Sequence, residues 1–286
     1  MRVQARNSGA LDFLLECVGF PPDFLLDELV GRALRDGEPA AWRGDPRTHR
    51  RLPIVAGVDL AIERDTTRDG WTVVPHYRQE TRLRVAVEEI RKIPDSRFDA
   101  LLIGWAAPPI RSDEDFSRAL AEERAGLLTL HEPGAYPICA YLTDARRLPG
   151  SLLQGHVLAV TIAGFALDVG YLGPNEGVFD RDVLQRESGA SVVPLGGEGD
   201  PGGCAEISVR IQSVRHLRNP ITGADFDLLT VDAPERPLTL FVSRWQLEKD
   251  GLPPPRPGLR IEGVFLFSGR IAGGLPGPRT SAAVFG

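Results

Sequence analysis

The chain has 286 residues, of which 42% are hydrophobic, so it is long enough to form two domains with buried cores. Its formal net charge is −6. This charge argues against a protein that coats nucleic acid or an anionic membrane through bulk electrostatics, although a local basic surface is compatible with it.

Residues 10–37 carry a helical pattern. Gly37 stands where a left-handed cap would end the second of two short helices. These helices are too short to fold alone, so we expect them to cover a sheet or to dock on a partner. Six apolar residues at helical spacing form one stripe: Leu25, Leu26, Leu29, Val30, Ala33 and Leu34.

The residues that follow predict a loop and then a β-hairpin. Residues 38–52 are rich in Pro, Gly and Arg and have no periodicity, which is typical of a loop. Residues 52–77 alternate apolar side chains on both sides of RDTTRDG, and the dipeptide Asp69-Gly70 favours a tight turn. We therefore assign residues 1–81 to an N-terminal segment of helices and a hairpin.

Two stretches, residues 82–172 and 203–286, show the same features in the same order. Each begins with a strand pattern, a polar turn and a second strand pattern opened by Phe-Asp. A third strand, a short helix-prone piece and a Pro-Gly-strand-Gly unit follow in both. We interpret the two stretches as a degenerate tandem repeat, with a helical insertion at residues 108–134 of the first copy.

Residues 173–202, between the two copies, contain six acidic residues and two arginines. We interpret them as an acidic, glycine-rich linker. Their GEGDPG motif matches the phosphate-binding pattern G-x-G-x-x-G. However, Glu198 and Asp200 would repel a phosphate and Pro201 lacks a backbone donor, so the motif predicts a linker and not a phosphate site.

The order of elements within each copy indicates the fold class. Three strands, a short helix and a long strand are typical of a small Greek-key barrel, and an OB-like barrel has its helix between the third and fourth strands. The sequence therefore predicts a mainly β protein with two tandem OB-like or Greek-key barrels. Another barrel or sandwich, or an α+β arrangement, agrees with the same order. The fifth strand is weakly marked, with residues 165–172 and 280–285 as candidates.

Catalytic and cofactor motifs are missing from the sequence. It has no G-x-S-x-G, no P-loop, no H-E-x-x-H and no EF-hand loop, and its five histidines stand singly. We therefore expect no catalytic residue, no cofactor and no metal. The cysteines are far apart and form no C-x-x-C pair, which favours a reducing compartment; they are Cys17, Cys139 and Cys204.

The sequence predicts neither a secretory signal nor a membrane span. Asp12 and Glu16 interrupt the only apolar stretch near the amino terminus. The longest apolar run, residues 157–167, is about half the length that a membrane-spanning helix needs. We expect a cytoplasmic protein without membrane association.

The second copy carries the most suggestive binding residues. Arginines and aromatic side chains on its strands could stack bases and neutralise phosphates. The alternative is that alternating arginines form the solvated side of half-buried strands and protect their edges. The candidates are Arg210, Arg215, His216, Arg218, Phe241, Arg244, Trp245 and Arg260.

These patterns predict a non-catalytic protein that binds a macromolecule. A protein partner is the first expectation, in the role of an adaptor, a complex subunit or an inhibitor, because paired modules can raise avidity without a strong site on either. The alternative is binding of single-stranded nucleic acid through the arginine and tryptophan face of the second copy. An enzyme that assembles its site without a motif is the third reading.

Overall fold

The structure is a computed structural model. It describes residues 12–39, 49–55, 57–65, 70–78, 82–93, 100–107, 135–145, 148, 152, 154–172, 190–197, 200–233 and 237–273. The predicted helical insertion at 108–134 and the candidate strand at 280–285 lie outside these residues.

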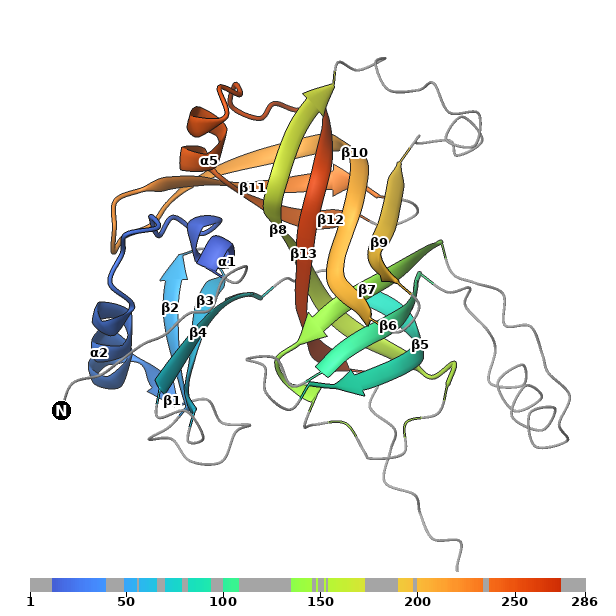
Figure 1. Cartoon of the computed structure of the whole chain (residues 1–286), viewed down its shortest axis with the longest axis horizontal. Helices are drawn as coiled ribbons and strands as arrows, with labels where there is room; N and C mark the ends of the chain where they lie inside the picture. The colour runs from blue at the N-terminus through green and yellow to red at the C-terminus, as the bar shows by residue number, and fades with distance from the viewer. Residues whose placement is uncertain are drawn as a thin grey trace, which may run out of the picture.

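Strands make up 64% of the described residues and helices are few, which confirms the mainly β class. The strands form a four-stranded antiparallel sheet and a nine-stranded mixed sheet (Figure 1). The first sheet contains β1 (Glu38–Pro39), β2 (His49–Val55), β3 (Val58–Asp65) and β4 (Gly70–Tyr77). The second contains β5 (Leu83–Lys92), β6 (Ala100–Ala106), β7 (Tyr136–Leu142), β8 (Val157–Leu172), β9 (Ser191–Gly197), β10 (Asp200–Arg218), β11 (Asp225–Asp232), β12 (Leu238–Ser243) and β13 (Arg260–Gly273).

The described residues include three helices, namely α1 (Asp12–Glu16), α2 (Leu26–Asp36) and α5 (Arg244–Lys249). In α2 the centre of the predicted apolar stripe is buried, whereas its outer members Leu25 and Leu34 are exposed. Gly37 ends α2 in an extended conformation and not in the predicted left-handed one, and its N–H donates to the carbonyl oxygen of Ala33. The helix therefore runs directly into β1.

The N-terminal sheet contains the predicted hairpin and a further strand, the seven-residue β2, which the sequence pattern did not separate from β3. Strands β3 and β4 pair antiparallel, as the alternation predicts. Strand β2 pairs with the other side of β3, although its first residues fall in the stretch predicted to be a loop. The first three residues of β2 are polar and do not alternate with apolar residues, so the sequence shows no strand pattern there. Their side chains are instead hydrogen-bonded within the protein: His49 to Glu63, Arg50 to the carbonyl oxygen of Gly37, and Arg51 to Glu38.

In the nine-stranded sheet, the pairings close into two rings of five strands. The first ring consists of β5, β6, β7, the end of β13, and β8. The second ring consists of β10, β11, β12, the end of β8, and β13. Strands β8 and β13 belong to both rings and pair with each other along most of their length. Each ring therefore contains four strands from its own part of the chain and one from the other part.

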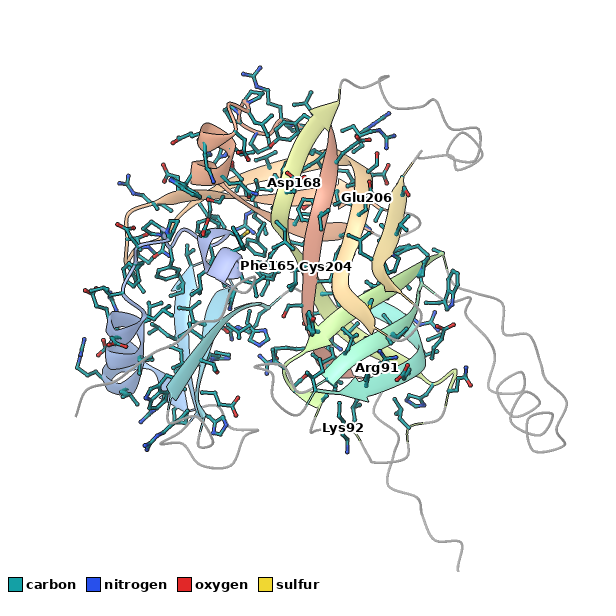
Figure 2. The ribbon with its side chains drawn as sticks, viewed as in Figure 1. Arg91, Lys92, Phe165, Asp168, Cys204 and Glu206 are labelled. Carbon is teal, nitrogen blue, oxygen red and sulfur yellow. The ribbon has the colours of Figure 1, made fainter. Side chains whose placement is uncertain are left out.

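The exchanged segments are the second halves of β8 and β13. The first half of β8 pairs with β5, and residues 163–165 then pair in parallel with β12. In the same way the first half of β13 pairs with β10, and residues 268–269 pair in parallel with β7. Figure 2 shows Phe165 and Asp168 on the part of β8 that lies in the second ring, and Arg91 and Lys92 at the end of β5 in the first ring.

The two rings agree in local detail as well as in strand order. A bulge interrupts β5 between Val87 and Glu89, and another interrupts β10 between Ile211 and Ser213. At these bulges the N–H of Gly155 donates to the carbonyl oxygen of Val87, and the N–H of Gly258 donates to that of Ile211. Both glycines have positive φ, at 80° and 91°, which other residues rarely adopt. The structural counterpart of Gly258 is therefore Gly155.

The end of the predicted linker is part of the sheet. Residues 191–197 form β9, which pairs with β10 and makes the edge of the nine-stranded sheet, and β10 begins at Asp200. Ala190 and Val192 are both buried, so apolar packing holds this segment in place. The glycines and acidic residues around them are typical of a linker, which is why the sequence did not indicate a strand here. Within the described residues, no helix is long and apolar enough to cross a membrane.

Candidate functional site

Two of the predicted binding residues, His216 and Arg244, meet around one buried carboxylate. Asp227 of β11 is fully buried, and its Oδ2 accepts a hydrogen bond from Nε of Arg244 at 2.8 Å. Nδ1 of His216 lies 2.5 Å from Oδ1 of Asp227, and Nη2 of Arg244 lies 2.8 Å from the same ring nitrogen. The hydrogen bonds from Arg244 to Asp227 raise the pKa of the Arg244 guanidinium. Arg244 is therefore a fixed cation whose charge is already balanced within the protein.

Local structure explains why Arg244 and Trp245 occupy these positions. Strand β12 ends at Ser243, whose hydroxyl oxygen accepts a hydrogen bond from the N–H of Gln246 and caps α5. The side chain of Gln246 donates to the carbonyl oxygen of Leu167 at 3.0 Å, which ties α5 to β8. The first turn of α5 is thus held from two sides, and Trp245 stays 43% exposed on its outer surface.

The other predicted residues do not join this cluster. Phe241 is fully buried and its ring stacks on that of Phe165, with centroids 5.2 Å apart, so it leaves no ring face for a ligand. Arg260 is 3% exposed and its Nη1 donates to the backbone oxygen of Ser208 at 3.2 Å. Its counterpart across the strand pair is Arg210. The remaining residues Arg210, Arg215 and Arg218 are exposed along β10.

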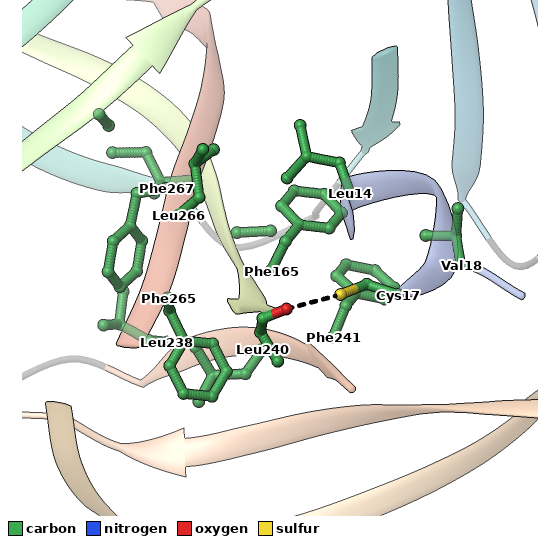
Figure 3. Close-up of a cluster of buried hydrophobic side chains, with 14 of the residues drawn as sticks. Leu14, Cys17, Val18, Phe165, Leu238, Leu240, Phe241, Phe265, Leu266 and Phe267 are labelled. Atoms are coloured by element: carbon green, nitrogen blue, oxygen red, sulfur yellow. Dashed lines mark hydrogen bonds between the residues drawn. The ribbon is translucent and has the colours of Figure 1, made fainter. Parts of the chain in front are cut away.

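The outer face of β11 and β12 is covered by the N-terminal segment. Figure 3 shows Leu14 and Cys17 beside Phe165 and Phe241, with the Sγ of Cys17 donating to the carbonyl oxygen of Ala166 at 3.2 Å. The ring of Tyr77, from β4, meets that of Phe241 edge-on with centroids 5.2 Å apart. In OB folds this face commonly binds extended ligands. Here the protein's own residues fill it.

The corresponding face of the first ring is covered as well. The beginning of β10 crosses β7, and Gly203 lies directly against the ring of Tyr141. A Cβ atom at residue 203 would lie 2.3 Å from Cδ2 of Tyr141, so only glycine permits this close approach. The neighbouring Cys139 is buried, and burial raises the pKa of its thiol to about 12.

A pocket of about 290 Å³ opens next to the Asp227 cluster. Its walls come from three segments: the residues after α1, the turn between β10 and β11, and the start of α5. The Nδ2 of Asn219, in that turn, donates to the carbonyl oxygen of Val18 at 2.9 Å and holds the first two walls together. The lining residues are Glu16, Gly19, Phe20, Pro21, Gly223, Ala224, Asp225, Ser243, Arg244, Trp245 and Glu248.

The pocket brings together residues that the sequence analysis did not connect. Glu16 is separated from Asp225 by more than two hundred positions, and no motif links them. Asp225 and Asp227 are visible in the sequence as an acidic pair, but Asp225, the first residue of β11, lines the pocket, whereas Asp227 is buried. Only the run Arg244-Trp245 was recognisable in advance, because a cation beside an exposed aromatic is a typical binding pair.

Neither thiol nor metal chemistry is indicated in the described part of the chain. Burial raises the pKa of the thiols of Cys17, Cys139 and Cys204, so all three are protonated at neutral pH and are poor nucleophiles. No group of three or more His, Cys, Asp or Glu side chains is arranged to hold a metal ion among the described residues.

We expect Asp227→Asn to lower the free energy of unfolding by about 1–3 kcal/mol, because a buried charged acceptor is lost while the size of the side chain is retained. Urea denaturation of the purified variant measures this loss. Asp232→Asn, on the same strand but partly exposed, is the control and should change the value by less than about 0.5 kcal/mol. Equal effects of the two substitutions would show that the Asp227 cluster does not stabilise this site.

Comparisons with known protein families, with curated proteins and with solved structures found no significant match to this chain.

Proposed function

We propose that this chain is a non-catalytic protein-binding protein that docks a partner at the pocket beside Trp245. The observation that carries the proposal is an exposed tryptophan, 43% accessible, on the rim of a pocket whose walls are fixed by hydrogen bonds. Tryptophan is enriched among the residues that dominate protein interfaces, and a rigid surround lowers the entropy cost of binding.

The proposal includes two OB-like barrels, one for each ring. In the second ring, α5 follows the third strand β12 and precedes the fourth strand β13, as an OB-like order requires. The fifth position is filled by the end of β8, which runs parallel to the third strand and antiparallel to the fourth. The first ring has equivalent pairings, which supports a tandem repeat of one module.

Binding of single-stranded nucleic acid is the second candidate, and the contacts of the second ring argue against it. The face of β11 and β12 is occupied by α1 and β4, and Phe241 is buried there. The Arg244 charge is balanced by Asp227, and Arg260 is buried. What favours this candidate is the exposure of Arg210, Arg215 and Arg218 on β10.

The test is affinity purification of the full chain from the cells that naturally contain it, followed by reconstitution with the purified partner. We expect a partner that binds wild type and Val193→Ala, a control at another exposed apolar residue, with equal affinity. Trp245→Ala should weaken binding at least about tenfold, since truncation of an interface tryptophan costs more than about 1.4 kcal/mol.

A second measurement addresses the nucleic-acid alternative. Fluorescence polarisation of labelled single-stranded oligonucleotides at low salt should show no binding by the wild-type chain. A signal that falls steeply as salt rises, and falls again on replacement of Arg215 and Arg218, would overturn the proposal in favour of nucleic-acid binding.

A further inference from the structure

The charged side chains that line the pocket are mainly acidic. Asp225 and Glu248 are exposed, and their carboxylates have no hydrogen bond or ion pair with any other described residue. Glu16 also lines the pocket, but it is 9% exposed and already has a partner within the protein. The single cation of the lining, Arg244, is already paired with Asp227 behind the wall. The pocket therefore presents an excess of negative charge to an incoming group.

The aromatic part of the rim already accepts a cation. Nζ of Lys249 lies 5.2 Å from the centroid of the Trp245 ring, within the range of a cation–π contact. This ring belongs to α5, the helix that also carries the Glu248 carboxylate. A cationic group entering the pocket would meet carboxylates from two elements, β11 and α5, together with the indole.

The size of the pocket suits one side chain. Its volume of about 290 Å³ lies at the lower edge of the range of about 300–1,000 Å³ for small-molecule sites. A guanidinium has planar donors that match a carboxylate and a flat surface that stacks on an aromatic ring, whereas an ammonium is a strongly hydrated point charge. The combination of carboxylates with an indole thus favours arginine over lysine.

We infer that the pocket formed by Asp225, Trp245 and Glu248 binds an arginine side chain of the protein partner. This inference rests on the proposed function and adds to it the chemistry that the partner must present. The partner docks through an exposed arginine whose guanidinium stacks on Trp245 and donates to the carboxylates of Asp225 and Glu248.

The probe is the peptide acetyl-Gly-Arg-Gly-amide, titrated into the full chain. Binding is followed by the indole N–H signal of Trp245 in a proton–nitrogen correlation spectrum, with the signals of Trp71 and Trp105 as references. We expect saturable binding in the millimolar range that shifts the Trp245 signal. The same peptide with citrulline, which keeps the shape of arginine without its charge, should bind at least about tenfold more weakly.

Two matched double variants separate the local carboxylates from net charge. Asp225→Asn with Glu248→Gln should weaken the arginine peptide at least about tenfold. Glu206→Gln with Asp232→Asn removes the same charge from β10 and β11 outside the pocket lining and should leave the affinity unchanged. Equal loss in both variants would overturn the inference, because it would assign binding to overall charge.

Other outcomes overturn the inference in distinguishable ways. Equal affinity for the citrulline peptide, or for a peptide with lysine in place of the arginine, would exclude recognition of a guanidinium. A partner that depends on Trp245 while the arginine peptide fails to bind would refute this inference and leave the proposed function intact. A peptide that binds while the partner ignores Trp245→Ala would refute the proposed function.

Discussion

Gly263→Ala is expected to destabilise the protein more than a glycine-to-alanine substitution at any other described strand position. Gly263 has a φ of +145°, and an added Cβ would lie 2.0 Å from the backbone oxygen of Asp168. Because the obstacle is backbone on the paired strand, β8 and β13 would have to separate there. Backbone strain alone costs about 1–3 kcal/mol, and the broken pairing adds to it, so we expect a loss of more than about 3 kcal/mol or failure to fold.

Gly170→Ala is the matched control for this experiment. Gly170 is on β8, opposite Glu262 and next to the pairing partner of Gly263, yet nothing lies within 4 Å of an added Cβ there. Alanine should therefore change the free energy of unfolding by less than about 1 kcal/mol. Thermal unfolding and the soluble yield of both variants measure the contrast. Equal stability of the two would contradict the register of β8 with β13 and with it the exchange between the rings.

Phe241→Ala should lower the free energy of unfolding by about 3–5 kcal/mol, the cost typical of a buried phenylalanine. Phe241 has no exposed surface and contacts three other rings: Tyr77, Phe165 and Phe226. Two of these belong to the nine-stranded sheet and one to the N-terminal sheet. The substitution therefore opens a cavity where the N-terminal segment covers the second ring.

Urea denaturation gives the loss for Phe241→Ala, and Phe13→Ala is its control. Phe13 has the same side chain but is 44% exposed, so its truncation should cost less than about 1.5 kcal/mol. Limited proteolysis adds a local readout, because cleavage within residues 12–39 should accelerate in the Phe241 variant. A loss below about 1 kcal/mol for Phe241→Ala would mean that the N-terminal segment is not held by this contact.

The sequence predicted the strands well where a strand buries one face or both. Alternating residues mark β5 and β10, whereas β11 buries four residues in a row and the third strands β7 and β12 are mostly apolar and mostly buried. The helix α2 was also recognisable, because its buried residues recur at helical spacing. These patterns depend only on residues that are close together in the sequence, so they can be recognised without knowing the fold.

Pairings between distant segments could not be predicted in the same way. The sequence predicts the fifth strand of the first copy at residues 165–172, whereas these residues continue β8 into the second ring. An apolar stretch of sequence does not indicate which other strand it will pair with. The burial of Phe241 could not be predicted for the same reason, because the residues that cover it, such as Tyr77, lie more than 160 positions away in the sequence. Its position in the strand pattern is equally compatible with an exposed side chain.

The shared strands β8 and β13 give each half of the nine-stranded sheet the geometry of one subunit in a domain-swapped dimer whose two subunits have been fused. If the chain were cut between β8 and β9, each fragment would still supply the strand that the ring of the other fragment needs. Either fragment alone would form only four strands of its ring. A shortened form of the protein would therefore have to retain both halves of the sheet in order to fold. It would also need residues from both sides of that cut to form the Trp245 pocket, which is lined by residues within 16–21 and 223–248.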